Sequence, residues 1–255
     1  MQSIDDADAA SARSARAALE LLLADAPAIA SILPARFLER AERFVAMLLR
    51  ANRVHNLTRV TAPEEVARLH LLDALAALPI IDELAAESAI DLGSGGGLPG
   101  VPLALARPQL RWTLVDSVAK KAAVLRDLTD ALGMPNVTVL AARAEQLGRE
   151  PQHRERHTVA TARALAALPT LVELALPLVE IGGALIAWKG ALTEEADEVR
   201  RGRSAIEQLG GGQLAIRDTG LAALGGHRLI VVAKERPTQP RFPRRPGQAG
   251  RRPLA

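Results

Sequence analysis

The chain has 255 residues, of which 49% are hydrophobic and 24% charged, and its formal net charge is +3. This length and composition suit one large α/β domain with extensions, and no apolar run approaches the roughly 20 residues needed to cross a bilayer. The first residues are acidic where a secretory signal is basic, so we expect a cytoplasmic protein that is not exported.

Two residue types are missing from the sequence, and their absence excludes several kinds of site and reaction. The chain has no cysteine, which excludes disulfides, thiolate metal sites and methylation at C5 of a pyrimidine, a reaction that needs a thiolate nucleophile. We therefore expect no bound metal. The chain also has no tyrosine, which argues against the Asn/Asp-Pro-Pro-Tyr sites used on exocyclic base amines. Aromatic residues make up only 2%, too few for a base-stacking platform.

The positive charge is concentrated at the C-terminus. From Lys234 to the end, seven lysines and arginines stand against one acid, Glu235, so this segment carries +6 and the rest of the chain −3. A basic, proline-rich tail on a mildly acidic domain predicts contact with a polyanion. The alternative is a tail that only keeps the protein soluble.

Three helices are predicted before the first strand. They cover residues 11–26, residues 35–51, and a segment that begins at Pro63 and ends before Pro79. His70 and Asp73 lie three residues apart on the third helix. They either line a substrate cleft or form a hydrogen-bonded pair on the helix surface.

A glycine-rich turn follows the first predicted strand, residues 89–92, and leads into an apolar helix over residues 101–106. Strand, glycine turn and helix form the first half of a βαβ unit, in which bare backbone and free N–H groups receive a ligand. Gly95, Gly97 and Gly100 formally fit the dinucleotide fingerprint G-x-G-x-x-G.

The register of this turn favours a different ligand. The turn should begin at Gly93, where the strand ends, and counted from there the third fingerprint position is Leu98. Asp91, two residues earlier, would repel a pyrophosphate and attract the ammonium of S-adenosylmethionine (SAM). An ordinary strand–helix connection is the remaining interpretation, but four glycines exceed what it needs.

A second carboxylate ends the next predicted strand, residues 110–116. Asp116 lies 23 residues after Gly93, where an acceptor for a ribose hydroxyl belongs in a nucleoside-binding α/β fold. NAD and SAM sites share this feature, so it indicates an adenosine nucleoside without choosing between them.

The third strand also leads into candidate ligand contacts. A helix over residues 117–132, capped by Ser117 and closed by Gly133, precedes this strand, predicted over residues 136–141. Lys120 and Lys121 in the first turns of the helix point at phosphate or form a solvated face. After the strand come Ala144 and Glu145, which offer a backbone amide and a carboxylate for the adenine ring.

The second half of the chain predicts the rest of the sheet. A strand over residues 157–162 ends at Arg163, near the switch point, where a guanidinium can meet the cofactor carboxylate, a target base or a phosphate. A helix (170–180), a strand (183–188) that leads into Lys189, and a helix (194–209) follow. Strands 213–218 and 227–233 predict an antiparallel hairpin that closes the sheet, which is typical of methyltransferases.

Several motifs together resemble the RsmG (GidB) family of bacterial ribosomal RNA methyltransferases, from about Arg50 to the C-terminus. The most specific is the Leu-Pro-Gly-Val-Pro continuation of the glycine turn. The matching segments are Asn56-Leu57-Thr58, His70-Leu71-Leu72-Asp73, residues 91–103, Asp116-Ser117 with Lys120-Lys121, Arg143-Ala144-Glu145, Arg163-Ala164, Trp188-Lys189-Gly190 and the tail from Pro237 through Gly247. The chain departs from the family pattern at Ala74, Gly96 and Leu165.

This resemblance implies a class I SAM-dependent methyltransferase fold, Rossmann-like, with a mostly parallel seven-stranded sheet, a terminal antiparallel hairpin and an N-terminal helical cap. The expected segments are a helical extension that need not be rigid (1–34), the helical cap (35–80), the methyltransferase domain (81–235) and the basic tail (236–255).

The implied reaction is methylation of guanine N7 in 16S ribosomal RNA, alone or in the small subunit, by a monomer. With Asp116 from the strand analysis, the expected SAM-binding residues are Gly93, Leu98, Asp116, Ala144, Glu145 and Arg163. No catalyst is assigned; Arg163 and Lys189 are candidates for orienting the base or a phosphate.

Three alternatives stay open. One is a SAM-dependent methyltransferase for another RNA site or a small molecule. The others are an NAD-dependent oxidoreductase and an RNA-binding protein built on an inert SAM fold.

Overall fold

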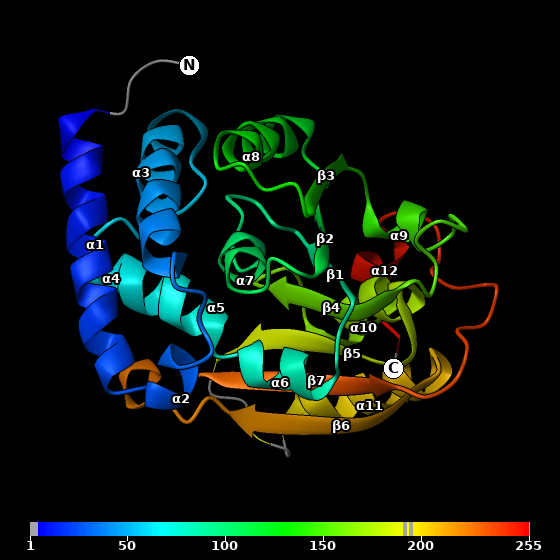
Figure 1. The fold of residues 1–255 in the computed structure, drawn as a ribbon. Helices are drawn as coiled ribbons and strands as arrows, with labels where there is room; N and C mark the ends of the chain where they lie inside the picture. The colour runs from blue at the N-terminus through cyan, green and yellow to red at the C-terminus, as the bar shows by residue number, and fades with distance from the viewer. Residues whose placement is uncertain (1–4, 191–192, 194–195, 255) are drawn as a thin grey trace.

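A computed structural model describes residues 5–190, 193 and 196–254. Its centre is one seven-stranded sheet in the order β3-β2-β1-β4-β5-β7-β6 (Figure 1). Strands β1 to β5 pair in parallel, and β7 runs antiparallel to both β5 and β6. The predicted sheet with its terminal hairpin is thereby confirmed. The strands are β1 (Ser88–Leu92), β2 (Arg111–Asp116), β3 (Val137–Ala141), β4 (His157–Arg163), β5 (Val179–Lys189), β6 (Gly211–Asp218) and β7 (Arg228–Lys234).

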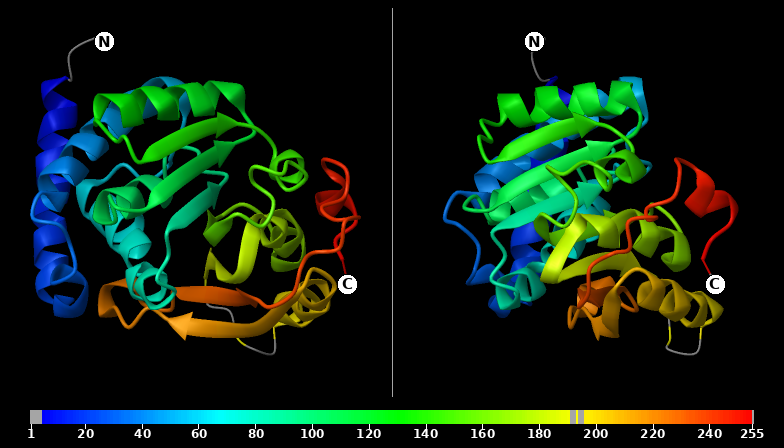
Figure 2. Two further views of the ribbon diagram at one scale, coloured as in Figure 1. Left: turned by 45° about the vertical axis from the view of Figure 1, so that its right-hand side comes forward. Right: turned by 90° about the vertical axis from the view of Figure 1, so that its right-hand side faces the viewer.

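Both faces of the sheet are covered by helices, so its inner strands are apolar on both sides (Figure 2). Successive side chains alternate between the two faces: Ala89 joins one hydrophobic cluster and Ile90 the other. The first cluster includes residues of α7 (Gly100–Ala106) and α8 (Ala119–Ala131). The second includes residues of α10 (Leu168–Ala175) and α11 (Asp197–Gln208).

The first two predicted helices are present as α1 (Asp6–Ala24) and α3 (Phe37–His55), and a short helix that was not predicted, α2 (Pro27–Ala30), lies between them. The first helix begins earlier than expected, because the Asp5 carboxylate caps it by accepting from the Ala7 N–H. Helix α1 packs against α3, and the fully buried Leu19 and Phe44 belong to the same cluster. The first helix is therefore part of the core.

The third predicted helix is present from Pro63 to Leu75, but it is not a regular α-helix. Pro63 begins a single turn, α4 (Pro63–Glu65), after which residues Val66–Leu72 form a π-helix, η1. The Asp73 N–H donates to the Arg68 carbonyl, five residues back. Short helices α5 (Asp73–Leu75) and α6 (Leu78–Glu83) complete the segment. Seven π-helical residues point to a functional constraint, because such turns are rare and gather at functional sites.

Other boundaries also differ from the prediction. Ser117 does not cap α8: the cap position is Val118, whose N–H is bound by Asp116, so the helix starts two residues later. The helix predicted to reach residue 180 ends at Ala175, since Pro177 interrupts it within a short 3-10 turn, η2 (Leu176–Leu178). Strand β5 consequently begins at Val179. Helix α11 begins at Asp197, and Glu194, its predicted start, lies outside the described residues.

The chain after β7 returns across the domain. It passes α9 (Ala144–Leu147) and ends in a short helix, α12 (Gln248–Arg251), packed on α10 (Figures 1 and 2). A 3-10 turn, η3 (Ala222–Leu224), lies between β6 and β7. Of the helices in the described part of the chain, none is long and apolar enough to span a membrane.

Candidate functional site

One cavity, of about 370 Å³, lies at the carboxyl ends of four parallel strands. Its walls are the turns that follow β1, β2, β3 and β4, and β1 and β4 flank the switch point of the sheet. Ligands of open α/β sheets bind at this position. A larger hollow of about 530 Å³ lies between α3 and α8 and contains none of these turns. The predicted residues Gly93, Asp116, Ala144 and Glu145 all line the cavity at the strand ends.

Asp116 links the ends of the first two strands. Its Oδ2 accepts from the Gly95 N–H (2.9 Å) and its Oδ1 from the Val118 N–H (2.8 Å). The carboxylate therefore fixes the glycine turn relative to the start of α8. It also lines the cavity, where a carboxylate oxygen can accept from a ribose hydroxyl.

One glycine of the turn, Gly93, lines the cavity. Gly93 has a φ of +71°, and a Cβ built there would lie 2.7 Å from Leu165 Cδ1. The left-handed backbone favours glycine, and any larger residue would also displace the Leu165 side chain. Leu98 lies farther along the turn, is 9% exposed and packs in the core rather than lining the cavity.

Glu145 belongs to α9, directly after β3, and is 7% exposed. Its Oε1 accepts from the Gly247 N–H of the C-terminal segment (2.8 Å). Within residues 5–190, 193 and 196–254, no group donates a hydrogen bond to its second oxygen, Oε2. That oxygen is available for a donor on a ligand in the cavity.

Asp91 is fully buried beneath the glycine turn and does not line the cavity. Its Oδ1 accepts from the Thr161 hydroxyl (2.7 Å), whereas Oδ2 has no hydrogen-bond partner in the described part of the chain. Burial raises the pKa of this carboxyl to about 6, although the Thr161 hydroxyl opposes the shift. A cation near the turn would give this carboxylate the positively charged partner that it lacks.

Arg163 ends β4 and connects it to the π-helix. Its Nη1 donates to the Leu69 carbonyl (2.7 Å) and to Asp73 Oδ2 (3.0 Å), and Nη2 lies 3.5 Å from His70 Nδ1. Arg163 is not among the residues that line the cavity. His70 and Asp73 are both buried, and the guanidinium joins them, so they are not a pair on the helix surface. Burial, with Arg163 adding to it, lowers the pKa of His70 to about 4.

Asp73 is the centre of this second polar group. Besides Arg163, its carboxylate meets His227 Nδ1 (3.0 Å), and its carbonyl accepts from the Trp188 indole N–H (2.7 Å). Lys189, next to Trp188, donates to the Ala166 carbonyl (2.9 Å) and pairs with Glu198. The two orienting candidates therefore lie outside the cavity, at the ends of β4 and β5.

Several cavity residues were not among the expected SAM-binding residues. Ala164 and Leu165 follow β4, and Val118 and Leu174 complete the apolar wall. Ala164 has a φ of +54°, a strained value for alanine of the kind that gathers at functional sites. Nothing in the local sequence signals this conformation, because alanine gives no indication of a left-handed turn.

Comparison with known proteins identifies the family. The family model GidB, described as rRNA small subunit methyltransferase G, matches residues 37–222. A protein named ribosomal RNA small subunit methyltransferase G from Roseiflexus sp. (strain RS-1) is 45% identical over 236 residues, covering 92% of this chain and 100% of that protein. A protein of the same name from Deinococcus radiodurans is 41% identical over 217 residues, 85% of each chain.

Solved structures agree on the fold. The apo S-adenosylmethionine-dependent methyltransferase SibL aligns with a TM-score of 0.51 at 19% identity, over 71% of this chain and 61% of that one. A putative O-methyltransferase from Klebsiella pneumoniae aligns with a TM-score of 0.50 at 18% identity, over 84% and 96%. Fold, glycine turn and relatives agree, and this chain belongs to the GidB family of rRNA small subunit methyltransferases G.

Proposed function

We propose that this protein is a SAM-dependent methyltransferase that transfers a methyl group to N7 of a guanine in 16S ribosomal RNA. The observation that carries the proposal is the cavity at the ends of β1 to β4, where two carboxylates from adjacent strand ends flank a glycine turn. This donor and acceptor set suits an adenosine nucleoside. Its volume, about 370 Å³, is within the range of small-molecule sites, roughly 300–1,000 Å³.

The residues at this site fit SAM. Asp116 and Glu145 offer carboxylate oxygens to the ribose and the adenine, and Gly93 and Ala144 bring backbone close to the ligand. Asp91 Oδ2, a buried acceptor without a partner in the described residues, suits a positively charged cofactor. We assign Leu98 to the packing that shapes the turn, and Arg163 to the side of the pocket where the π-helix meets β4.

The proposed reaction does not depend on general acid or base catalysis by the protein. When bound, SAM supplies a sulfonium methyl group that a nucleophile attacks. Guanine N7 has an in-plane lone pair and no proton to lose, so no general base is needed. The protein then contributes positioning and electrostatics. Arg163 and Lys189 are the candidates for orienting the target, acting from the ends of β4 and β5.

The proposal includes the substrate, the location in the cell and the domain organisation of the protein. The substrate is 16S ribosomal RNA, free or in the small subunit, and the protein acts in the cytoplasm as a monomer. Residues 81–235 form the methyltransferase domain, residues 35–80 the helical cap and residues 236–255 the basic tail. Residues 1–34 extend the cap.

The test is a label-transfer assay. Purified protein with methyl-labelled SAM is incubated with 16S RNA, and in parallel with small subunits, from cells that lack this protein. We expect label in 7-methylguanosine after digestion, and a strong reduction for Glu145→Ala. Label at another nucleobase position, or only on small molecules, would refute the proposal. A thermal-shift comparison of SAM with NAD separates the oxidoreductase alternative, and the absence of any transfer by a SAM-binding chain would favour the inert RNA-binding one.

A further inference from the structure

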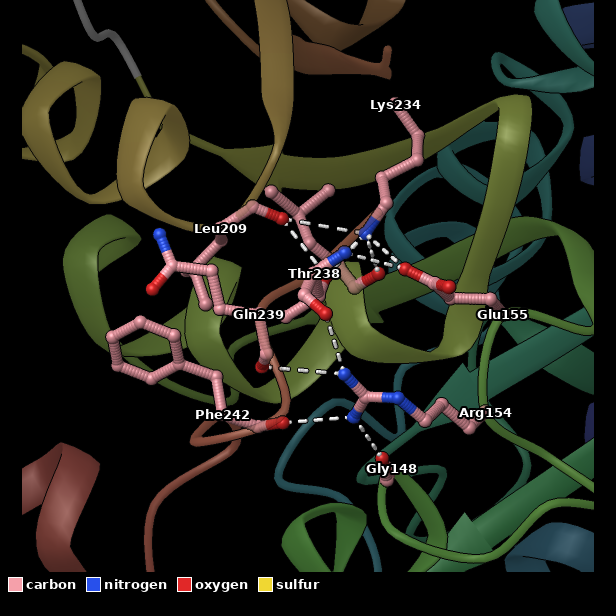
Figure 3. Close-up of polar contacts among 9 residues, drawn as sticks. Gly148, Arg154, Glu155, Leu209, Lys234, Thr238, Gln239 and Phe242 are labelled. Carbon is pink, nitrogen blue, oxygen red and sulfur yellow. Dashed lines mark hydrogen bonds and ion pairs between the residues drawn. The ribbon is translucent and has the colours of Figure 1, made fainter. Parts of the chain in front are cut away.

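The C-terminal strap, residues 236–254, is fastened to the domain at two places, although its composition describes it only as a basic, proline-rich tail. The first fastening lies at its start and is built around Arg154 (Figure 3). This guanidinium donates to four backbone carbonyls, three of them in the strap: Gly148 (2.7 Å), Thr238 (2.7 Å), Phe242 (2.8 Å) and Gln239 (3.3 Å). Such a set of bonds fixes the path of the backbone.

An ion pair with a buried lysine completes the first fastening (Figure 3). Lys234, at the end of β7, lies 3.2 Å from Glu155 and donates to the Leu176 carbonyl (2.8 Å) and the Thr238 hydroxyl. Glu155 also accepts from the Thr238 N–H (2.6 Å). The Lys234 side chain has no exposed surface, whereas that of Glu155 is 24% exposed, so the pair is only partly screened by solvent and salt.

The second fastening joins the strap to α10. Glu173, whose side chain is fully buried, accepts from the Arg244 N–H (2.9 Å) and Nε (2.8 Å) and pairs with its Nη2. A buried carboxylate with several charge-assisted bonds is a strong and directional contact. The Thr170 hydroxyl donates to the Ala249 carbonyl (3.2 Å), so the strap is held on both sides of residue 247.

Between these contacts the strap reaches the cavity. Gly247 has a φ of +78°, and its N–H donates to Glu145 Oε1 at 2.8 Å. Glu145 is nearly buried and lines the cavity, so this bond selects one orientation of a carboxylate with several rotamers. The bond occupies one oxygen and leaves the other for a ligand donor.

We propose that the strap is part of the cofactor site: the Gly247 N–H holds the Glu145 carboxylate ready to accept from the adenosine end of SAM. Gly247 is then a positioning residue, which acts through Glu145. This inference rests on the proposed function, because it requires SAM in the cavity. Pre-positioning raises affinity because the ordering of the side chain is completed before the ligand arrives.

The test compares two shortened chains by calorimetric titration with SAM. A chain that ends at Arg245 keeps the Arg154 fastening and the Arg244–Glu173 pair but lacks Gly247 and the Ala249 carbonyl. A chain that ends at Gly250 keeps all of them. Both lack Arg251 and Arg252, so their side-chain charges are the same. We expect about tenfold weaker SAM binding for the chain ending at Arg245, the scale of one weakened hydrogen bond to a charged group. The chain ending at Gly250 should bind within about twofold of the full chain.

A double-mutant cycle shows whether the strap acts through Glu145. In a Glu145→Ala background, ending the chain at Arg245 should change SAM affinity less than about twofold, because the group to be positioned is gone. A purely structural strap would weaken binding equally in both backgrounds and would overturn the inference. So would equal affinities of the two shortened chains.

A pair of glycine variants covers the case in which a shortened chain does not fold. A Cβ at Gly247 or at Gly250 meets no atom within 4 Å, but only Gly247 has a positive φ. Gly247→Val should therefore displace the N–H and weaken SAM binding severalfold, while Gly250→Val should not. Equal affinities would overturn the inference. A full-length chain that binds no SAM would instead overturn the proposed function, and this inference with it.

Discussion

The buried carboxylate of Asp91 should make stability fall as the pH rises, the reverse of an ordinary salt-bridged acid. Its pKa is about 6 in the folded protein, against 3.8 for an aspartate exposed to water, as it is in the unfolded chain. The folded state therefore holds a proton between pH 4 and 6 that the unfolded state has released. At about 1.4 kcal/mol per pH unit, ionised Asp91 costs the folded state ~3 kcal/mol above pH 6.

The perturbation is Asp91→Asn, which keeps an acceptor for the Thr161 hydroxyl and removes the charge. We expect the free energy of unfolding of the variant, minus that of the parent, to increase by about 2 kcal/mol between pH 4 and pH 7. Urea unfolding at intervals of half a pH unit measures this difference. Burial lowers the pKa values of His70 and His157 to about 4, so these histidines add stability as the pH rises. Their contribution is the same in the variant and the parent, and it cancels in the difference between the two unfolding free energies.

A second variant checks the cause. Thr161→Val removes a hydroxyl that holds the pKa of Asp91 down. In a Thr161→Val background, the stability difference made by Asp91→Asn should therefore keep rising to a pH above 6. A difference curve for Asp91→Asn that stays flat to within about 1 kcal/mol from pH 4 to 7 would refute the reasoning. Asp91 would then be ionised throughout, with a cationic or hydrogen-bonding partner that neutralises the cost of burial.

Two further predictions concern charge at the site and on the strap. If the ammonium of SAM lies near Asp91, SAM binding favours the ionised carboxyl, so SAM affinity should rise from pH 5 to 7 and binding should release a proton. Calorimetric titrations in two buffers of different ionisation enthalpy measure this proton release. Equal heats of binding in the two buffers at pH 6 would contradict the prediction. Arg244→Ala leaves buried Glu173 without its cation and should lower the unfolding free energy by about 3–5 kcal/mol. The control is Arg36→Ala, which breaks the exposed pair with Glu39 and should lower it by at most about 1 kcal/mol. Similar losses for both arginine variants would show that burial of Glu173 is not the cause.

Local sequence was sufficient for the parts of the site that follow strand ends. Gly93 and Asp116 each follow an apolar, alternating run, and parallel strands bring such positions to one edge of the sheet. The same logic placed Ala144 and Glu145 in the cavity wall. Arg163 and Lys189 also stand at strand ends but do not line the cavity, because a long side chain can turn away, and here Arg163 meets Asp73 and Lys189 meets Glu198.

By itself, the sequence determined the order of strands and helices, the glycine turn and the edge of the sheet at which a ligand binds, since these depend on contacts within one βα unit. Only the tertiary structure decided the π-helix, the strained Ala164 and the contact between Gly247 and Glu145. Those two residues are 102 positions apart, and their hydrogen bond exists because Arg154 and Glu173 hold the strap against the domain. Composition described the strap only as basic; the contacts that attach it involve residues whose local patterns carry no sign of the pairing.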